Sequence, residues 1–417
     1  MRSNPPRPRV MSEEHPRAVE RGATPLRVSP LVRTPLRLQV VFLLLLVASV
    51  AWRKGTYYSG GLDAVVVAKG VLTLVALATV VTAPRQGLPW SRLRAAPLVW
   101  LLLYLAISAV GGLLGTSGLA SVVLAARLGL LAVTLVLIMR RYPWQTVLSS
   151  LMSSMLVLAL VSGATGIASI SATGRLYGGI LPLNANEISL LISVPVICIV
   201  WRIVNGLAGM PEVLTIVPLL GVIWLTGART GLAAVFVAVC LLVMMAPRIP
   251  VPLFSLSVLA IPLVLYLAFW TPLLTGFASR GGSESVTTLN SRTVAWSAAL
   301  RYADTDGAKL FGSGLAVKEI PVSAMYRSEQ IFDSTWVSAL VQSGLLGTAV
   351  LVMFVVASLA VAVTLQPPER SLVVAILLML TLISVLESGL FDSTPSFIAF
   401  FVLVSYAHSL PGQTSRE

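Results

Sequence analysis

The sequence is poor in charge, cysteine and histidine. Charged residues make up 11% of its 417 positions, less than half of the roughly 25% typical of soluble domains, and this excludes an ordinary soluble globular enzyme. Its two cysteines, Cys198 and Cys240, both fall inside apolar runs, where they are expected to be small buried apolar residues with no disulfide. The two histidines are His15, near the N-terminus, and His408, at the end of the last apolar run.

What the sequence has instead is apolar residues. They make up 57% of the chain, enough for about twelve membrane spans of roughly 20 residues each. The apolar stretches are continuous, whereas an outer-membrane barrel shows alternation. We therefore expect an all-α fold, a polytopic membrane helix bundle of about twelve transmembrane helices, with a large outer loop containing short helices between the ninth and tenth. The apolar runs are 38–52, 62–82, 96–115, 119–139, 146–170, 185–203, 212–227, 230–246, 250–270, 338–365, 371–387 and 393–410.

The distribution of Lys and Arg predicts the orientation of this bundle. If the N-terminus is cytoplasmic, the inner segments hold 17 basic residues, whereas the short outer loops hold only Arg53, Lys54, Arg175 and Arg229. This is the bias that the positive-inside rule describes. The net charge of +13 is therefore attributed to topology, and nucleic acid is not expected as a partner.

Composition divides the chain into three parts. Residues 1–37 contain eight arginines and are expected to form a disordered cytoplasmic tail near anionic lipids. Residues 38–410 form a single transmembrane domain, and 411–417 form a second cytoplasmic tail. The outer loop, 271–333, is about sixty residues long, and loops of this length are usually functional or disordered.

The outer loop carries signs of order. Ser291–Tyr302 is predicted to be helical, since Arg292, Trp296 and Leu300 follow one another at a spacing of four residues and so share one helix face. Residues 304–307, Asp-Thr-Asp-Gly, are typical of a turn.

Four ionisable residues fall in or beside apolar runs. Lys69 and Arg127 lie inside runs, where a centrally placed cation costs about 2.5–3.5 kcal/mol on insertion scales. They are interpreted either as the lining of a charged cavity or as an internal ion pair or snorkelling side chain. Glu187 and Glu387 lie near outer helix ends. Each is interpreted either as a helix-end charge or as a site residue.

Two short outer segments place an arginine beside a membrane helix. In the first, Arg175, a Gly-Gly pair, Asn184 and Asn186 precede a helix; glycine permits close approach of a ligand, and asparagine either caps the helix or donates to a ligand. In the second, Gly-Ala-Arg229-Thr-Gly joins two helices. An Arg at a helix N-terminus makes an anion site, or it snorkels from a hairpin.

A third outer segment adds a carboxylate. It runs from Arg292 through Trp296 to Phe-Gly-Ser-Gly314, and it ends at Asp333-Ser-Thr-Trp336 before the next helix. Asp333 is either the N-cap of that helix or a general base at the mouth of a cavity. Together the three segments place three arginines and one carboxylate on one face of the membrane. This combination suits one chemistry, in which arginines bind a diphosphate whose lipid tail lies in the bilayer. Diphosphate is a good leaving group once fixed cations hold its charge.

The sequence resembles the O-antigen ligase and O-antigen polymerase superfamily of bacteria in five places, which occur in order between about residues 170 and 350. They are Arg175-Leu-x-Gly followed by Asn; Gly-Ala-Arg-Thr-Gly; Ser-Arg292-x-x-x-Trp296; Phe-Gly-x-Gly314; and Asp333-Ser-x-Trp-Val-x-x-Leu-x-Gln-x-Gly-Leu-Leu-Gly347. The long outer loop before the last three helices is also similar.

The resemblance implies a function and a set of site residues. Family members are twelve-helix inverting glycosyltransferases of the plasma membrane that pass a glycan from an undecaprenyl-diphosphate carrier to an acceptor hydroxyl without a metal or other cofactor. By this resemblance Arg175, Arg229 and Arg292 hold the diphosphate, and Asp333 is the base or orients the acceptor. Residues expected to line the cavity or meet the acceptor are Asn184, Asn186, Trp296, Arg301, Gly314, Ser334 and Trp336.

The chain departs from the ligase pattern at two adjacent positions. Asp333 falls where the ligases carry a catalytic histidine, and Ser334 falls where many carry asparagine. Some polymerase-type members have aspartate there, so both polymerase and ligase stay open. A transporter or flippase of lipid-linked sugars, without catalysis, is the alternative that Lys69 and Arg127 favour, and a peptidoglycan-type polymerase of similar topology is a third.

Overall fold

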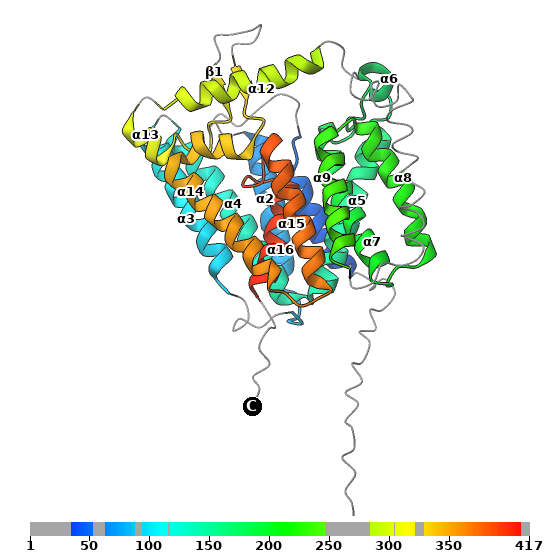
Figure 1. Cartoon of the computed structure of the whole chain (residues 1–417). Coiled ribbons are helices and arrows are strands. Elements are labelled where there is room, and N and C mark those ends of the chain that lie inside the picture. The colour runs from blue at the N-terminus through cyan, green and yellow to red at the C-terminus, as the bar shows by residue number, and fades with distance from the viewer. Residues whose placement is uncertain are drawn as a thin grey trace, which may run out of the picture. The chain divides into compact units, whose positions relative to one another are not determined.

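The protein is a bundle of apolar helices. The computed structural model describes residues 35–52, 63–87, 94–115, 117–246, 284–303, 305–321 and 329–409, all within one compact unit, Leu31–Glu417. Seven helices in this part of the chain are long and apolar enough to cross a membrane: α2 (Ala64–Val81), α3 (Ala96–Leu114), α4 (Gly118–Arg141), α5 (Trp144–Thr165), α7 (Ala185–Val204), α14 (Thr335–Val363) and α15 (Glu369–Leu386). Four apolar helices are shorter: α1 (Leu36–Ser49), α8 (Met210–Thr226), α9 (Arg229–Met244) and α16 (Pro395–His408) (Figure 1).

These helices agree with the pattern of apolar runs. Each of them coincides with one predicted run, and the remaining run, 250–270, lies outside the described residues. The first helix begins at Leu36, two residues before the boundary predicted for the basic tail. The all-α class and the membrane-embedded character of the chain are therefore confirmed.

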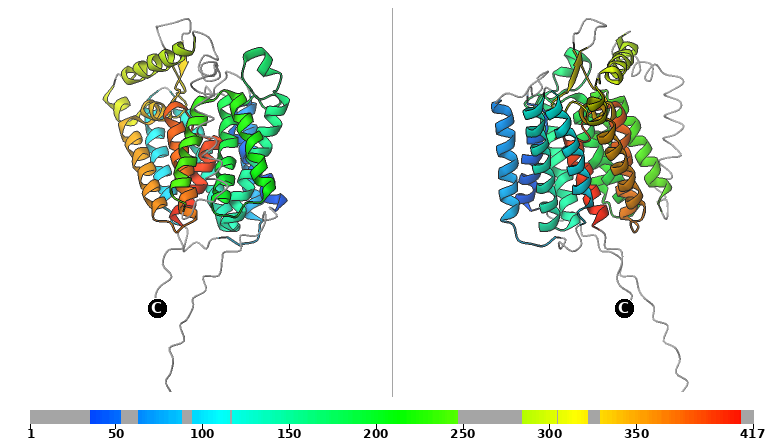
Figure 2. Two further views of the ribbon diagram at one scale, coloured as in Figure 1. Left: turned by 45° about the vertical axis from the view of Figure 1, so that its right-hand side comes forward. Right: turned by 90° about the vertical axis from the view of Figure 1, so that its left-hand side faces the viewer.

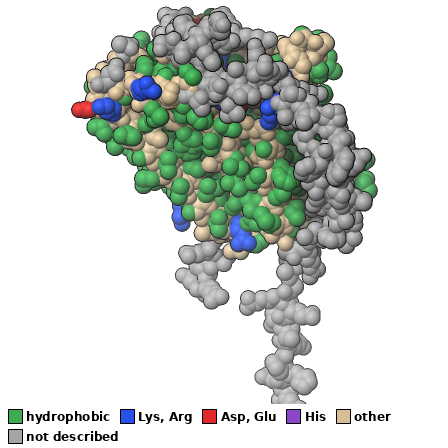
Figure 3. All heavy atoms as spheres, turned by 45° about the horizontal axis from the view of Figure 1, so that its top comes forward, with side chains coloured by type: hydrophobic (Ala, Val, Ile, Leu, Met, Phe, Trp, Pro, Cys, Tyr) green, Lys and Arg blue, Asp and Glu red, His purple; other side chains and the backbone are tan. Residues whose placement is uncertain are grey.

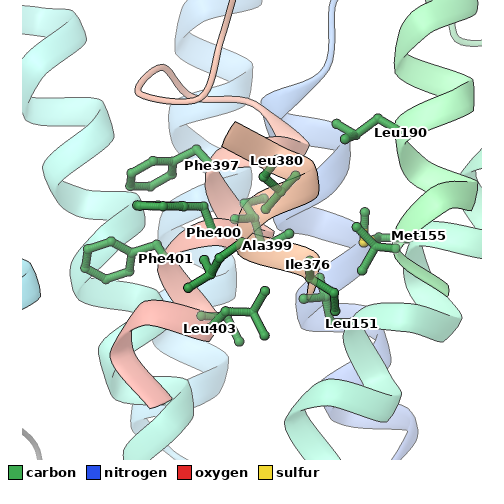
Figure 4. Close-up of a cluster of buried hydrophobic side chains, with 14 of the residues drawn as sticks. Leu151, Met155, Leu190, Ile376, Leu380, Phe397, Ala399, Phe400, Phe401 and Leu403 are labelled. Atoms are coloured by element: carbon green, nitrogen blue, oxygen red, sulfur yellow. The ribbon is translucent and has the colours of Figure 1, made fainter. Parts of the chain in front are cut away.

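Helix α16 lies at the centre of the bundle. Almost all of its residues are buried, as expected for a helix that is apolar on every side. Phe397, Phe400 and Phe401 of this helix pack with Leu380 of α15, and the cluster extends to Met155 of α5 (Figure 4). A helix of 14 residues is thus held by its neighbours on all sides.

The lateral surface of the bundle is apolar. Large hydrophobic side chains of α2, α3 and α14 are exposed, among them Val71, Leu113 and Val356, and Figure 3 shows hydrophobic side chains covering the visible side of the helices. An apolar surface of this extent marks contact with a membrane. Helix α2 stands at the margin of the bundle (Figure 2), with only 17% of its span buried.

One end of the bundle, here called the basic end, carries mainly arginine. Arg37 of α1 donates to Thr82 Oγ1 after α2 (2.6 Å), and Trp201 of α7 donates to the Pro368 carbonyl before α15 (3.0 Å), which ties the helix termini together. The described arginines at this end are Arg37, Arg85, Arg94, Arg140, Arg141, Arg202 and Arg370, and the described carboxylates are Glu212 and Glu369.

The opposite end, here called the cap end, carries charges of both signs. The described basic side chains there are Arg175, Arg229, Arg292, Arg301, Lys309 and Lys318, and the described carboxylates are Asp63, Glu187, Asp306, Glu319, Asp333, Glu387 and Asp392. The described residues of the two ends therefore differ in charge balance: basic residues outnumber carboxylates at the basic end but not at the cap end.

A small cap covers part of this end (Figure 1). It consists of α12 (Glu284–Arg301), α13 (Asp306–Phe311) and an antiparallel pair, β1 (Glu319–Pro321) and β2 (Glu329–Ile331). Ala299, Ile320 and Phe332 pack with Val341 of α14 into a separate apolar cluster. The helix predicted at Ser291–Tyr302 is present but begins earlier. The turn predicted at 304–307 is wrong over its second half, because the side chain of Thr305 caps α13 by accepting from the Ala308 N–H (3.2 Å).

Two glycine-containing motifs of the sequence hold α13 against α14. Ser313 N–H donates to the Val341 carbonyl (2.8 Å) and Gly314 N–H to the Gln342 carbonyl (3.0 Å). Gly344 interrupts α14 with a φ of 64°, and a Cβ on it would collide with the carbonyl group of Leu310. Glycine is therefore required where the two backbones meet.

Replacing Gly344 by Ala is expected to lower the thermal unfolding midpoint of the purified protein clearly. A side chain at this left-handed position costs about 1–3 kcal/mol, and displacing the facing backbone adds a further roughly 1–3 kcal/mol of overpacking. Gly221→Ala is the matched control. A Cβ at Gly221 has nothing within 4 Å, and Gly221 lies inside α8, where alanine is the better helix former. Equal midpoints for both variants would contradict this account of the junction.

Candidate functional site

Arg175 is fixed in front of α7 by the hairpin between α8 and α9. Its Nε donates to the Thr226 carbonyl (2.9 Å), and its Nη2 donates to Asn186 Oδ1 (3.1 Å). Gly227 has a φ of 64°, and a Cβ on it would come within 3.3 Å of the Arg175 Nε. The glycine of the Thr-Gly-Ala-Arg hairpin thus gives the guanidinium room to lie against the backbone.

Glu387 joins Arg175 to the cap. Its Oε1 accepts from Asn186 Nδ2 (2.6 Å) and lies 3.5 Å from Arg292 Nη2. Arg292 Nε in turn donates to Asp333 Oδ2 (3.4 Å). Five side chains, Arg175, Asn186, Glu387, Arg292 and Asp333, therefore form one continuous polar network, here called the arginine network.

Buried backbone holds Glu387 and Asp333 close together. The Glu387 carbonyl accepts from the backbone N–H of Thr335 (3.2 Å) and from its Oγ1 (2.9 Å), and Asp333 lies two residues before Thr335. The connection from α15 to α16 then turns into the core, where Phe391 packs edge-on against Phe400 with ring centroids 5.4 Å apart. The network is therefore anchored on the packed part of the bundle.

The members of the network differ in exposure, and burial changes the protonation of Glu387. The side chains of Arg292 and Glu387 are 22% and 23% exposed, whereas that of Asp333 is 45% exposed. Burial raises the pKa of the Glu387 carboxyl to about 7, although Arg292 and the hydrogen bond from Asn186 favour its charged form. Glu387 is thus about half protonated near neutral pH, and Asp333 is the more accessible carboxylate.

The structure brings together four of the residues that the sequence singled out: Arg175, Asn186, Arg292 and Asp333. Asn184 instead caps α7, in a capping box in which Glu187 accepts from its backbone N–H (2.8 Å). Arg229 is the exposed first residue of α9, two positions after Gly227.

The remaining candidate residues are not members of the arginine network. Trp336 Nε1 donates to Ser384 Oγ (3.1 Å), and Ser334 is buried at the start of α14. Trp296 Nε1 is buried with no acceptor in the described part of the chain. Gly314 packs against Gly112 and Ser121 in the junction, and Arg301 is exposed in the last turn of α12.

Sequence reasoning did not decide the place of Glu387. The sequence left it open as either a helix-end charge or a site residue. In the structure it accepts a hydrogen bond from Asn186 and forms an ion pair with Arg292, and so joins the two halves of the network. The available signal was its position: it ends an apolar run whose other residues, 371–386, carry no charge. Its partners are 201 and 95 positions away in sequence (Asn186 and Arg292), so only the fold reveals them.

The network combines two guanidinium groups, an amide and two carboxylates at one end of an apolar bundle. Arginine forks recognise phosphate oxygens with paired, charge-assisted hydrogen bonds, and an accessible carboxylate accepts a proton or orients a hydroxyl. In the described part of the chain, no three His, Cys, Asp or Glu residues lie together as metal ligands would. No known family model matches this sequence, and no curated protein matches it either.

Proposed function

We propose that the protein is a membrane glycosyltransferase that transfers a glycan from a polyprenyl-diphosphate carrier to an acceptor hydroxyl. The observation that carries the proposal is the convergence of Arg175 and Arg292 on Glu387 and Asn186, with Asp333 beside Arg292. The resemblance of five sequence motifs to the O-antigen ligases and polymerases supports the same activity.

The arginine network accounts for each step of such a transfer. Arg175 and Arg292, with Arg229 from the adjacent hairpin, bind the diphosphate and stabilise its charge as the bond from the sugar anomeric carbon to the diphosphate oxygen breaks. The acceptor oxygen forms the new glycosidic bond from the opposite face of the sugar, which inverts the configuration. Asp333 takes the acceptor proton as that oxygen becomes acidic, or it orients the hydroxyl. Polyprenyl diphosphate leaves as an anion held by the arginines.

The proposal includes a topology. Twelve spans, including the run 250–270, place both termini in the cytoplasm of a bacterial plasma membrane and the cap end outside. Outside the long segment before α14, the described cap end has only Arg175 and Arg229 as basic residues, whereas the basic end has seven arginines. This bias in the short connections supports the orientation by the positive-inside rule. The carrier lipid then reaches the arginine network from the outer leaflet, and the glycan products belong to polysaccharide assembly at the cell envelope.

Donor binding is expected to weaken as the pH rises through about 7. Protonated Glu387 is neutral, so below this pH the network has one more net positive charge for the diphosphate. We expect the donor KM to rise by up to roughly tenfold between pH 6 and pH 8.

The raised pKa of Glu387 also affects stability. The folded protein binds a proton that the unfolded chain releases, so the contribution of Glu387 to stability is present in acid and is lost as the pH rises towards 7.

The variant Glu387→Gln tests this pH dependence. Glutamine keeps an oxygen acceptor for Asn186 and Arg292 but does not titrate, so its donor KM should be nearly constant over the same range. A KM that rises equally with pH in both proteins would assign the dependence to another group. Thermal unfolding of both proteins at pH 6 and pH 8 checks the stability effect.

The alternative function is translocation of lipid-linked glycans without catalysis, and the charges of Lys69 and Arg127 within α2 and α4 favour it. Reconstitution of the purified protein in liposomes with a fluorescent polyprenyl-diphosphate glycan separates the two. The proposal predicts new glycosidic bonds and release of the carrier diphosphate. Movement of the intact donor between leaflets with no new bond would support the alternative.

A further inference from the structure

An ion pair outside the arginine network joins the cap to the bundle. Lys318, just before β1, donates through Nζ to Asp392 Oδ2 in the connection between α15 and α16. Asp392 Oδ1 also accepts from the Ser393 N–H (2.8 Å). The same carboxylate attracts Lys69 of α2 and Arg127 of α4. The Lys318 side chain is only 17% exposed, so water and salt screen this pair less than a surface ion pair.

Lys318 is fixed relative to the segment that carries Asp333. The next residue, Glu319, begins β1, and β1 pairs with β2 so that Glu319 lies opposite Ile331. Ile331 precedes Asp333 by two residues, and Phe332 between them is buried in the apolar cluster of the cap. The strand pair therefore holds Lys318 and Asp333 in one piece of the cap.

Asp392 is fixed relative to Glu387 in the same way. The connection 387–394 turns around the Gly389 carbonyl, which accepts from the Asp392 N–H (3.2 Å) and from Thr394 Oγ1 (2.5 Å). Phe391, beside Asp392, is buried in the core of the bundle. The position of Asp392 is therefore tied to that of Glu387, the first residue of the connection.

The ion pair and Arg292 close a ring of contacts between these two segments. Arg292 Nη2 lies 3.5 Å from Glu387 Oε1, and Arg292 Nε donates to Asp333 Oδ2 (3.4 Å). Both distances are longer than the roughly 2.7–2.9 Å of a charge-assisted hydrogen bond. Arg292 therefore follows the separation of the two carboxylates and does not set it.

Two other contacts set that separation. One is the pair of hydrogen bonds from Thr335 to the Glu387 carbonyl, close to the arginine network. The other is the ion pair of Lys318 and Asp392, which joins the same two segments at a second place. Segments joined at one place turn about it, whereas segments joined at two places keep their side chains in register.

We propose that Lys318 is a positioning residue which, through its ion pair with Asp392, keeps Asp333 and Glu387 at the separation that Arg292 spans. The inference rests on the proposed function, because the geometry that Lys318 maintains is that of the transfer site. Lys318 acts through the arginine network and has no role of its own in binding the donor.

Loss of the ion pair is expected to lower kcat more than it weakens donor binding. Asp333 then loses its place beside the acceptor, and a misplacement of about 1 Å in an active site lowers the rate by up to roughly 100-fold. Donor binding suffers less, because Arg175 is fixed by the hairpin between α8 and α9.

Steady-state kinetics of the reconstituted full chain test the role of Lys318. Rates are divided by the amount of protein that binds polyprenyl diphosphate, so that a loss of folded protein alone does not change kcat. Methionine has nearly the length of lysine and no charge. For Lys318→Met we expect kcat to fall by about 10–100-fold, while the donor KM changes by less than about threefold.

Three further variants complete the test. Lys318→Arg keeps the ion pair and should retain kcat within about threefold of wild type. Lys318→Gln, which still donates a hydrogen bond to Asp392, replaces Lys318→Met if that variant does not fold, and its kcat should fall by about tenfold. Lys309→Met is the matched control, because Lys309 is 53% exposed and pairs with Asp306 at the surface of the cap, where an ion pair contributes little.

The outcomes separate this inference from the proposed function. Wild-type kcat in Lys318→Met, or in Lys318→Gln where it takes its place, would overturn the positioning role alone. A fall in kcat that Lys318→Arg shares would overturn it too, because the ion pair would then not be the cause. If the wild-type protein transferred no glycan at all, the proposed function would fail and this inference would fail with it.

Discussion

Replacing Asp333 by Asn is expected to lower the rate of glycan transfer by about 10²–10⁴-fold, the range for loss of a general base. Asparagine has nearly the same shape and still accepts from Arg292, whose Nε lies 3.4 Å from the Asp333 Oδ2, so the arginine network stays assembled. The variant loses the capacity to take a proton and one negative charge, and saturating donor removes the effect of that charge on donor binding. The measurement is the initial rate of product formation by the reconstituted protein at saturating donor.

The size of this effect separates the two roles of Asp333. If the carboxylate only orients the acceptor, the asparagine of the variant still offers a hydrogen bond, and the rate should fall by less than about tenfold. The control is Asp306→Asn, whose side chain is 95% exposed and pairs with Lys309 in α13. Unchanged thermal unfolding of both variants shows that the fold is intact, and full activity of Asp333→Asn would exclude a catalytic role.

Replacing Arg292 by Lys is expected to lower transfer by roughly 100-fold, as for loss of one preorganised charge donor. Arg292 contacts Glu387 through Nη2 and Asp333 through Nε, and lysine has a single ammonium group that does not span both. The charge is kept while the fork geometry is lost. We expect kcat to fall more than the donor KM rises, because the charge on the diphosphate develops as it leaves.

The same substitution at the opposite end of the bundle is the control for Arg292→Lys. Arg370 is the second residue of α15, at the basic end, and Arg370→Lys should leave kcat and KM unchanged. If Arg292→Lys retained wild-type kinetics, the guanidinium fork would have no part in catalysis.

Hydropathy made most of the fold predictable. Continuous apolar runs specify membrane helices because a bilayer requires internal backbone hydrogen bonding, and the described helices follow these runs. The capping box of α7 was also readable, since Asn184 and Glu187 stand three residues apart before an apolar stretch. Such features are local, so the sequence contains all the information that they need.

The site was predictable only in part. Arg175, Arg292 and Asp333 stood out because charged residues are rare in this chain, but their connection through Asn186 and Glu387 depends on contacts between distant segments. The role of Gly314 was also not readable, because its close contact with Gly112 arises only when α13 packs on α3 and α14. Long-range packing, and not local propensity, sets these positions.

The most direct test of the central claim is the affinity of the purified protein for polyprenyl diphosphate without a glycan. It is measured in the presence of excess phosphatidylglycerol, which suppresses non-specific binding of an anionic lipid. The account predicts that Arg175→Lys combined with Arg292→Lys weakens binding by at least about tenfold, whereas Arg94→Lys combined with Arg370→Lys, at the basic end, has no effect. Equal affinity of both double variants and the wild type would contradict the assignment of the arginine network as the diphosphate site.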